Sequence, residues 1–205
     1  MPHAPKQQRS LQTERRLLDA AEALIQERGL SGISIAEVVR RGSSSVGNFY
    51  SRFGDKDGLL RALHARRLNE VLEVLDGLAS TVGAMERETA VHLCMSQIVQ
   101  HYEDHAALMA AFNARSAADP IGWSQSIALH VELVQRLAEL LSATDGTSAH
   151  PRPRAALELG LHMAFSFLGD RSIHGTLGPS HTPFPPAQLP GELTRLILGY
   201  WRGLT

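Results

Sequence analysis

The sequence predicts an all-α fold with a small N-terminal domain of three helices and a larger helical domain after it. Two observations support this prediction. Apolar residues recur at three- and four-residue spacing along most of the 205-residue chain, and no run shows the period of two expected of a half-buried strand. Glycine, proline and small polar residues interrupt the pattern at intervals and divide it into helices of ordinary length.

The first helix is expected from about Leu11 to Arg28. Apolar side chains recur along one of its faces, and Gly29 stands just past its end, where a C-cap glycine is typical. The face comprises Leu17, Ala21, Leu24 and Ile25.

Two short helices follow. The segment Ser34-Ile35-Ala36-Glu37 has the serine and glutamate of a capping box, which predicts that the second helix begins after Ser34. Its buried stripe would be Ile35, Val38 and Val39. Residues 42–45, Gly-Ser-Ser-Ser, have the composition of a turn and an N-cap. The third helix would place Phe49 and Phe53 on its inner face and end at Gly54-Asp55.

The rest of the chain is also predicted to be helical. A long fourth helix begins after Asp55 and continues to about residue 78, and five more are expected near 84–103, 105–117, 121–142, 153–173 and 187–203. The connections 143–152 and 174–186 are rich in Gly, Pro and small polar residues and should be surface loops. We therefore divide the chain into a domain of residues 1–55 and a second domain of residues 56–205.

Charge is distributed unevenly between these domains. Residues 1–68 contain 12 Lys/Arg and 7 Asp/Glu, whereas residues 69–205 contain 8 and 14, and the net charge is −1. A basic head on an acidic body is typical of a protein whose head binds a polyanion. An ordinary solvated basic face is the alternative.

Composition also indicates the compartment. No segment approaches the roughly 18 uninterrupted apolar residues of a membrane helix, and residues 1–16 lack the apolar core of a signal peptide. Cys94 is the single cysteine and cannot form an internal disulfide. We therefore expect no membrane partner and a cytoplasmic location.

Residues 34–53 have the layout of a helix-turn-helix. The start of the second helix of this motif must then face outward and carry side chains that fit a DNA major groove. The segment Ser45-Val46-Gly47-Asn48 meets that requirement. Glycine inside a helix costs about 1 kcal/mol relative to alanine. Close approach of the backbone to another surface, such as DNA, would explain Gly47.

These residues resemble the DNA-binding domain of TetR-family regulators. The resemblance covers about residues 12–63, and its most specific part is Gly47, Phe49-Tyr50, Phe53 and Lys56 in register. Flanking segments also match: Arg16-Leu17-Leu18-Asp19-Ala20-Ala21, Glu27-Arg28-Gly29 and Leu59-Leu60. The chain departs from the family in its turn, where Gly42-Ser43-Ser44 replaces the usual Ala-Gly-Val. We expect weaker corner packing and a strained turn there.

The resemblance implies a role for each DNA-facing position. Ser45, Val46, Gly47 and Asn48 would lie in the groove. Phosphate contacts would come from Tyr50, with Ser51 and Arg52 nearby, from Lys56 at the start of the fourth helix, and from Ser34. Tyr50 could instead cover the small core, and Ser45 caps a helix with or without DNA.

For the larger domain the resemblance implies a ligand cavity and a dimer interface formed by the last two helices. Candidate cavity residues are Met95, Tyr102, Met109, Phe112, Trp123 and Phe165, all of which could equally be ordinary core. Candidate interface residues lie on one face of each helix: Leu157, Leu161, Phe165, Leu168, Leu193, Leu196, Ile197, Tyr200 and Trp201. Packing of these faces within one subunit is the alternative.

The sequence thus predicts a ligand-responsive repressor that binds a palindromic double-stranded DNA operator as a homodimer. A dimeric DNA-binding regulator without an effector is one alternative. A helical-bundle metalloenzyme is another, but no histidine has the Glu-x-x-His spacing of di-iron bundles and no hydrolase or phosphate-loop motif is present. We expect no catalytic residue, metal or cofactor, and expect His101 and His105 to be solvated.

Overall fold

The computed structural model describes residues 4–144, 146–174 and 184–203, in which all regular structure is helical. The helices are α1 (Ala4–Arg28), α2 (Ile35–Arg41), α3 (Val46–Phe53), α4 (Lys56–Gly83), α5 (Arg87–Asp104), α6 (Ala106–Ala118), α7 (Ser124–Ser142), α8 (Pro153–His174), the 3₁₀ turn η2 (Pro186–Gln188) and α9 (Leu189–Arg202). The predicted all-α class and each predicted helix are confirmed. None of the helices in the described ranges is both long and apolar enough to cross a membrane.

Two helix ends differ from the prediction, and each added segment contains a residue in contact with a distant part of the chain. α1 begins at Ala4 rather than near Leu11, and Ser10 in the added turns accepts a hydrogen bond from Arg52 of α3 at 3.0 Å. α4 continues to Gly83, beyond the expected end near residue 78, and its last turn buries Val82 completely. Neither contact is local in sequence, so helical periodicity did not reveal them.

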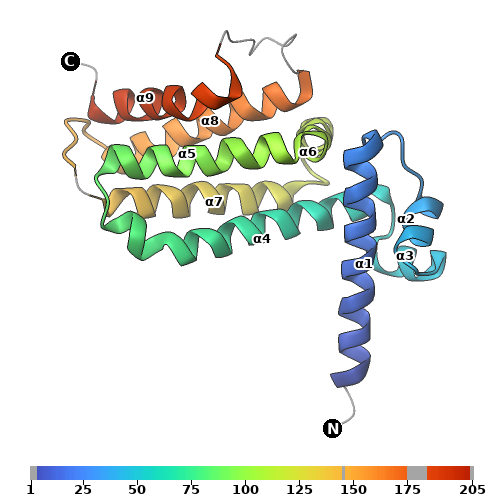
Figure 1. Ribbon diagram of the computed structural model, residues 1–205. Helices are drawn as coiled ribbons and strands as arrows, with labels where there is room; N and C mark the ends of the chain where they lie inside the picture. The colour runs from blue at the N-terminus through green and yellow to red at the C-terminus, as the bar shows by residue number, and fades with distance from the viewer. Residues whose placement is uncertain (1–3, 145, 175–183, 204–205) are drawn as a thin grey trace.

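The helices form a head and a body (Figure 1). α2 and α3 lie on one side of α1, and the body helices lie on the other side. α4 starts in the head and runs along the body beside α7, while α8 and α9 lie at the edge of the body opposite α4. The helix-turn-helix is therefore separated from the two C-terminal helices by α1.

Two apolar clusters hold the molecule together. The head cluster contains side chains of α1, α2 and α3, the first turns of α4, and Leu108, Phe112 and Trp123 of the α6 region. The body cluster joins α4, α5, α7, α8 and α9. The head therefore rests on α6 as well as on α4. A domain boundary between residues 55 and 56 stays a prediction.

The two predicted loops differ in how much the structure describes. Arg87 anchors the 143–152 loop by donating to the carbonyl oxygens of Leu141 and Gly146, at 3.1 and 3.3 Å. Its guanidinium also lies 4.1 Å from the ring centroid of Trp201. Residues 175–183 of the predicted 174–186 loop lie outside the described residues.

Candidate nucleic-acid interface

The start of α2 is fixed by the predicted capping box. The Ser34 hydroxyl accepts from the Glu37 backbone N–H at 3.3 Å, and the Glu37 carboxylate accepts from the Ser34 backbone N–H at 2.9 Å. Arg28 of α1 lies 2.8 Å from the same carboxylate. Hydrogen bonds from Ser34 and Arg28 lower the pKa of Glu37 from its usual 4.5 to about 2. The Ser34 hydroxyl is exposed but already bonded within the protein.

The turn of the motif combines a closely packed glycine with a strained serine. A Cβ on Gly42 would come within 3.1 Å of the Arg16 carbonyl oxygen and of a Leu17 methyl group, so any other residue there would require α1 to shift by a few tenths of an ångström. Ser43 adopts φ +48°, in the left-handed region that favours glycine. The hydroxyl of Ser44 is buried without a hydrogen-bond partner among the described residues. These observations fit the expected strain and weaker packing.

The outward face of α3 is formed by the predicted groove residues. Ser45 caps the helix by accepting from the Asn48 N–H at 3.2 Å. Phe49 is fully buried, which leaves Val46 and Tyr50 half exposed, at 50% and 51%. Gly47, Asn48 and Ser51 are also exposed. Figure 1 places α3 on the far side of α1 from α8 and α9, so the C-terminal helices do not cover this face.

The described residues leave open space at Gly47. A Cβ built there meets none of their atoms within 4 Å, and the backbone φ is not in the left-handed region. By contrast with Gly42, none of the described residues restricts a side chain at this position. The open space leaves room for an external surface such as DNA to approach the backbone, and that approach stays a prediction.

Arg52 and Lys56 are held by the protein itself. Arg52 donates to Ser10, and its guanidinium lies 3.9 Å from the carboxylate of Glu14. The Lys56 ammonium donates to the Ile33 carbonyl oxygen at 2.8 Å. Burial, together with repulsion from Arg115, lowers the pKa of Lys56. The ammonium group has three N–H donors, and the bond to Ile33 uses one, so two can still reach a phosphate. The phosphate contact by Lys56 stays a prediction.

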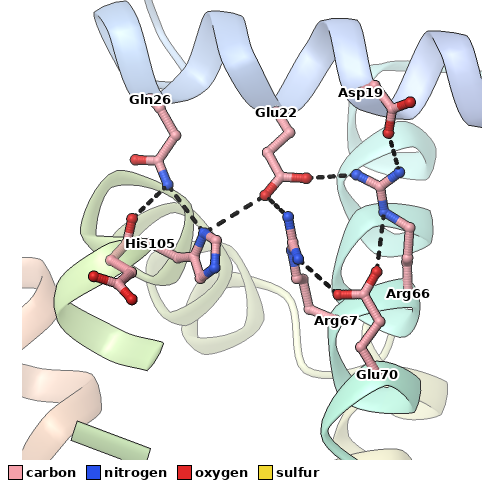
Figure 2. A network of polar contacts seen from close by, with 8 residues as sticks. Asp19, Glu22, Gln26, Arg66, Arg67, Glu70 and His105 are labelled. Carbon is pink, nitrogen blue, oxygen red and sulfur yellow. Dashed lines mark hydrogen bonds and ion pairs between the residues drawn. The ribbon is translucent and has the colours of Figure 1, made fainter. Parts of the chain in front are cut away.

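A buried carboxylate joins the head to the body (Figure 2). Glu22 of α1 is 8% exposed and pairs with Arg66 of α4, at 2.5 Å, and with Arg67. Asp19 and Glu70 contact the same two guanidiniums, each at 2.6 Å.

The same network reaches the corner between α5 and α6. Gln26 donates to the Asp104 carbonyl oxygen at 3.2 Å, and the His105 ring lies 3.5 Å from Glu22. Burial lowers the pKa of His101 to about 4 and also lowers that of His105. Since both histidines are partly buried at this junction, the expectation that they are solvated was wrong.

The body contains a cavity of about 450 Å³ between the first turns of α4 and helices α6, α7 and α8. A smaller one of about 60 Å³ adjoins it and is lined in part by Arg67 and His101. Five of the six predicted cavity residues line one or both: Tyr102, Met109, Phe112, Trp123 and Phe165. Met95 lines neither and is fully buried in the body core. Sequence reasoning missed His64, Asn113 and His130, which no motif distinguishes.

The predicted interface residues divide into two groups. Seven are buried within the single chain and leave little surface for a second subunit: Leu157, Leu161, Phe165, Leu168, Leu193, Ile197 and Trp201. Leu196 and Tyr200 are exposed, at 44% and 36%. The seven therefore fit the alternative of packing within one subunit. The opposite face of α8 exposes Leu159 and Met163 instead.

Comparison with known proteins identifies the head. Residues 17–63 match the family model described as bacterial regulatory proteins, tetR family. A stretch of 46 residues is 50% identical to the HTH-type transcriptional regulator BetI of Burkholderia thailandensis and covers 22% of this chain and 24% of that protein. Residues 17–63 therefore form a DNA-binding domain of the TetR type. A head of this type favours the regulator interpretation over the metalloenzyme alternative.

The likeness of fold extends over the body. A TetR-family regulator of Mesorhizobium loti superposes with a TM-score of 0.69 at 16% identity, covering 94% of this chain and 96% of that one. A TetR regulator of Rhodococcus sp. RHA1 superposes with a TM-score of 0.68 at 16% identity, covering 97% of this chain and 100% of that one. The TetR-family regulator PfmR of Thermus thermophilus superposes with a TM-score of 0.58 at 17% identity, covering 93% of this chain and 99% of that one. At these identities the likeness concerns the fold alone.

Proposed function

We propose that this chain is a TetR-family, ligand-responsive repressor that binds a palindromic operator as a homodimer in the cytoplasm. The main support is the outward face of α3, which carries Val46, Gly47, Asn48 and Tyr50 while Phe49 and Phe53 are buried behind it. A two-fold dimer would present this face twice, about 34–36 Å apart, which is one turn of B-form DNA.

DNA recognition is tested by selecting random duplexes on the purified protein and measuring affinity for the selected site by fluorescence anisotropy. Asn48→Ala should lose about 1–3 kcal/mol of preference for the selected site because a base-edge contact disappears. Lys56→Ala should weaken all duplexes alike and reduce the salt dependence. Asn69→Ala, at an exposed position of α4, is the matched control. If Asn48→Ala keeps its sequence preference, the assignment of the α3 face is wrong.

The proposed dimer uses the outer faces of α8 and α9. Leu159 and Met163 on α8, and Leu196 and Tyr200 on α9, are exposed apolar residues at i, i+4 spacing. Exposed apolar residues that recur along neighbouring helices are typical of an isologous interface between helical subunits. We infer that these outward faces, rather than the inward ones, contact the second subunit.

The cavity and the Glu22 network provide a route from ligand to DNA. Arg67 lines the smaller cavity and its guanidinium contacts Glu22 of α1. A ligand that displaces Arg67 would change how α1, and with it the head, rests on the body. The two recognition helices would then leave their operator spacing, so ligand and DNA would weaken each other's binding reciprocally.

A regulator without an effector is the competing proposal. Trp123 lines the larger cavity and is 1% exposed, so its fluorescence should respond to a compound bound there. Under our proposal the compounds that change this signal also release the selected duplex. Release of DNA by none of the compounds that bind would favour the alternative.

A further inference from the structure

The larger cavity is walled mainly by planar rings. The His64 ring lies edge-on to Phe112, with centroids 4.6 Å apart, and edge-on to Trp123 at 5.9 Å. In the part of the wall formed by α7 and α8, His130 meets Phe165 edge-on at 4.8 Å. Aromatic rings attract one another through offset and edge-to-face contacts beyond simple area burial. A flat aromatic molecule therefore fits this wall better than a flexible alkyl chain does.

His64 supplies an unused polar group in that wall. Its Nδ1 atom has almost no accessible surface and no hydrogen-bond partner among the described residues, so Nε2 is the ring nitrogen left for a ligand in the cavity that His64 lines. Burial, with a smaller contribution from His130, lowers the pKa of His64 to about 4, so the ring is neutral at pH 7. A neutral imidazole offers one donor and one acceptor. A hydroxyl group can both donate and accept, and so it matches either tautomer.

The charged residues around the two cavities already have partners. Asp170 at the edge of the larger cavity lies 3.1 Å from the His174 ring nitrogen. Arg67 in the smaller cavity pairs with Glu22 and Glu70. A charged ligand would therefore enter without a free counter-charge and would lose its hydration. These walls favour an uncharged ligand.

From these three observations we propose that the cavity beside His64 binds an uncharged aromatic compound bearing a hydroxyl group. The proposal rests on the ligand-responsive function proposed above and names the chemical class of its effector. The rings of Phe112, Trp123 and Phe165 would contact the aromatic body. The His64 imidazole would hydrogen-bond the hydroxyl. The volume of about 450 Å³ is within the range of small-molecule sites, about 300–1,000 Å³.

Calorimetric titration of the full chain at pH 7 with four probes tests this proposal. The probes are β-naphthol, naphthalene, naphthoate and decanol. We expect β-naphthol to bind about tenfold more tightly than naphthalene, the effect of one net hydrogen bond, and naphthoate and decanol to bind more weakly than β-naphthol. Equal affinity for β-naphthol and naphthalene, or tightest binding of naphthoate or decanol, would overturn the proposal.

Two variants test whether the preference for β-naphthol over naphthalene arises at His64. His64→Phe keeps a ring but removes both nitrogens, so it should abolish the preference for β-naphthol and leave naphthalene binding within about twofold. His92→Phe, at an exposed position of α5 away from the cavity, should keep the preference. A preference that survives His64→Phe would also overturn the proposal.

Operator binding is measured on the same preparations, which separates the two proposals. Probe binding without any sequence-specific DNA binding would support the cavity assignment and contradict the regulator function. Specific DNA binding without binding of β-naphthol would support the regulator function and contradict the cavity assignment.

Discussion

At the scale of single residues, Gly47 separates stability from function. Since a Cβ there meets nothing within 4 Å, Gly47→Ala should stabilise the folded protein by up to about 1 kcal/mol through helix propensity. The same methyl group would keep the α3 backbone away from DNA, so affinity for the operator should fall. Urea unfolding and anisotropy titration measure the two effects.

Gly77 gives this experiment its control. It also lies inside a helix, α4, with open space where a Cβ would be. Gly77→Ala should therefore give a similar gain in stability without changing DNA affinity. If Gly47→Ala binds the operator as tightly as the parent does, the close approach of DNA to this backbone is contradicted.

Ser43 is the second residue whose conformation predicts a measurable effect. A left-handed conformation costs a non-glycine residue about 1–2 kcal/mol, part of which glycine offsets through its freedom in the unfolded chain. Ser43→Gly, at φ +48°, should stabilise the protein by about 0.5–1 kcal/mol. Ser43→Ala keeps a Cβ at the same positive φ and should bring no such gain. Melting curves in which Ser43→Ala gains as much stability as Ser43→Gly would exclude this account of the turn.

At the scale of helices, the sequence predicted most of the architecture because local signals determine it. The capping box at Ser34 and the N-cap at Ser45 are set by side chains three residues from their backbone partners, and both form as predicted. The Gly47 to Lys56 pattern then identified the family of the head. These signals are local, so they can be read without knowledge of the body.

The features that the sequence did not predict depend on contacts between distant segments. The Glu22 network joins residues more than 40 positions apart, and the helical spacing of apolar residues does not predict such contacts. The sequence also left open whether the predicted face of α8 packs within one subunit or against a second one. Leu159 and Met163 have the same apolar character as Leu157 and Leu161, and packing of α8 against α6, α7 and α9 decides which pair is buried.

The Glu22 network gives the prediction at this scale. Glu22→Gln removes the charge that the two arginines share, but each arginine keeps another carboxylate, Asp19 or Glu70. We expect a loss of about 2 kcal/mol, less than the ~3–5 kcal/mol of a fully buried pair, because these side chains are partly exposed. Chemical denaturation measures the loss.

Asp19→Asn is the control for the network. It removes a partner of Arg66 at an end of the network where the Asp19 side chain is 69% exposed. Its cost should stay below about 1 kcal/mol. Equal losses of unfolding free energy for Glu22→Gln and Asp19→Asn would mean that Glu22 is not the main charged group at the contact between head and body.

At the scale of the whole molecule, buried histidines make stability depend on pH. Burial lowers the pKa of His64 and of His101 from 6.5 to about 4. Between those values the unfolded chain binds protons that the folded chain excludes, so stability falls as pH decreases from about 6.5 to 4. His64→Phe should reduce the difference between urea midpoints at pH 7 and pH 5. A difference as large as the parent's would show that His64 does not titrate on unfolding.

The oligomeric state tests the proposed contact between subunits. Met163→Glu places a charge on the outer face of α8, where the side chain is 49% exposed in the single chain. The folded subunit should tolerate it, but burial of an unpaired carboxylate in the interface should dissociate the dimer. Sedimentation velocity should then report a monomer with an unchanged circular dichroism spectrum.

Ile121→Glu provides the matched substitution away from that face. Ile121 is 88% exposed in the segment between α6 and α7, so the same charge there should leave the dimer intact. Because a palindromic operator requires two heads at fixed spacing, Met163→Glu should also lose specific DNA affinity while Ile121→Glu retains it. A dimer that persists in Met163→Glu would place the interface elsewhere, and a parent chain that sediments as a monomer would remove the geometric basis of operator recognition.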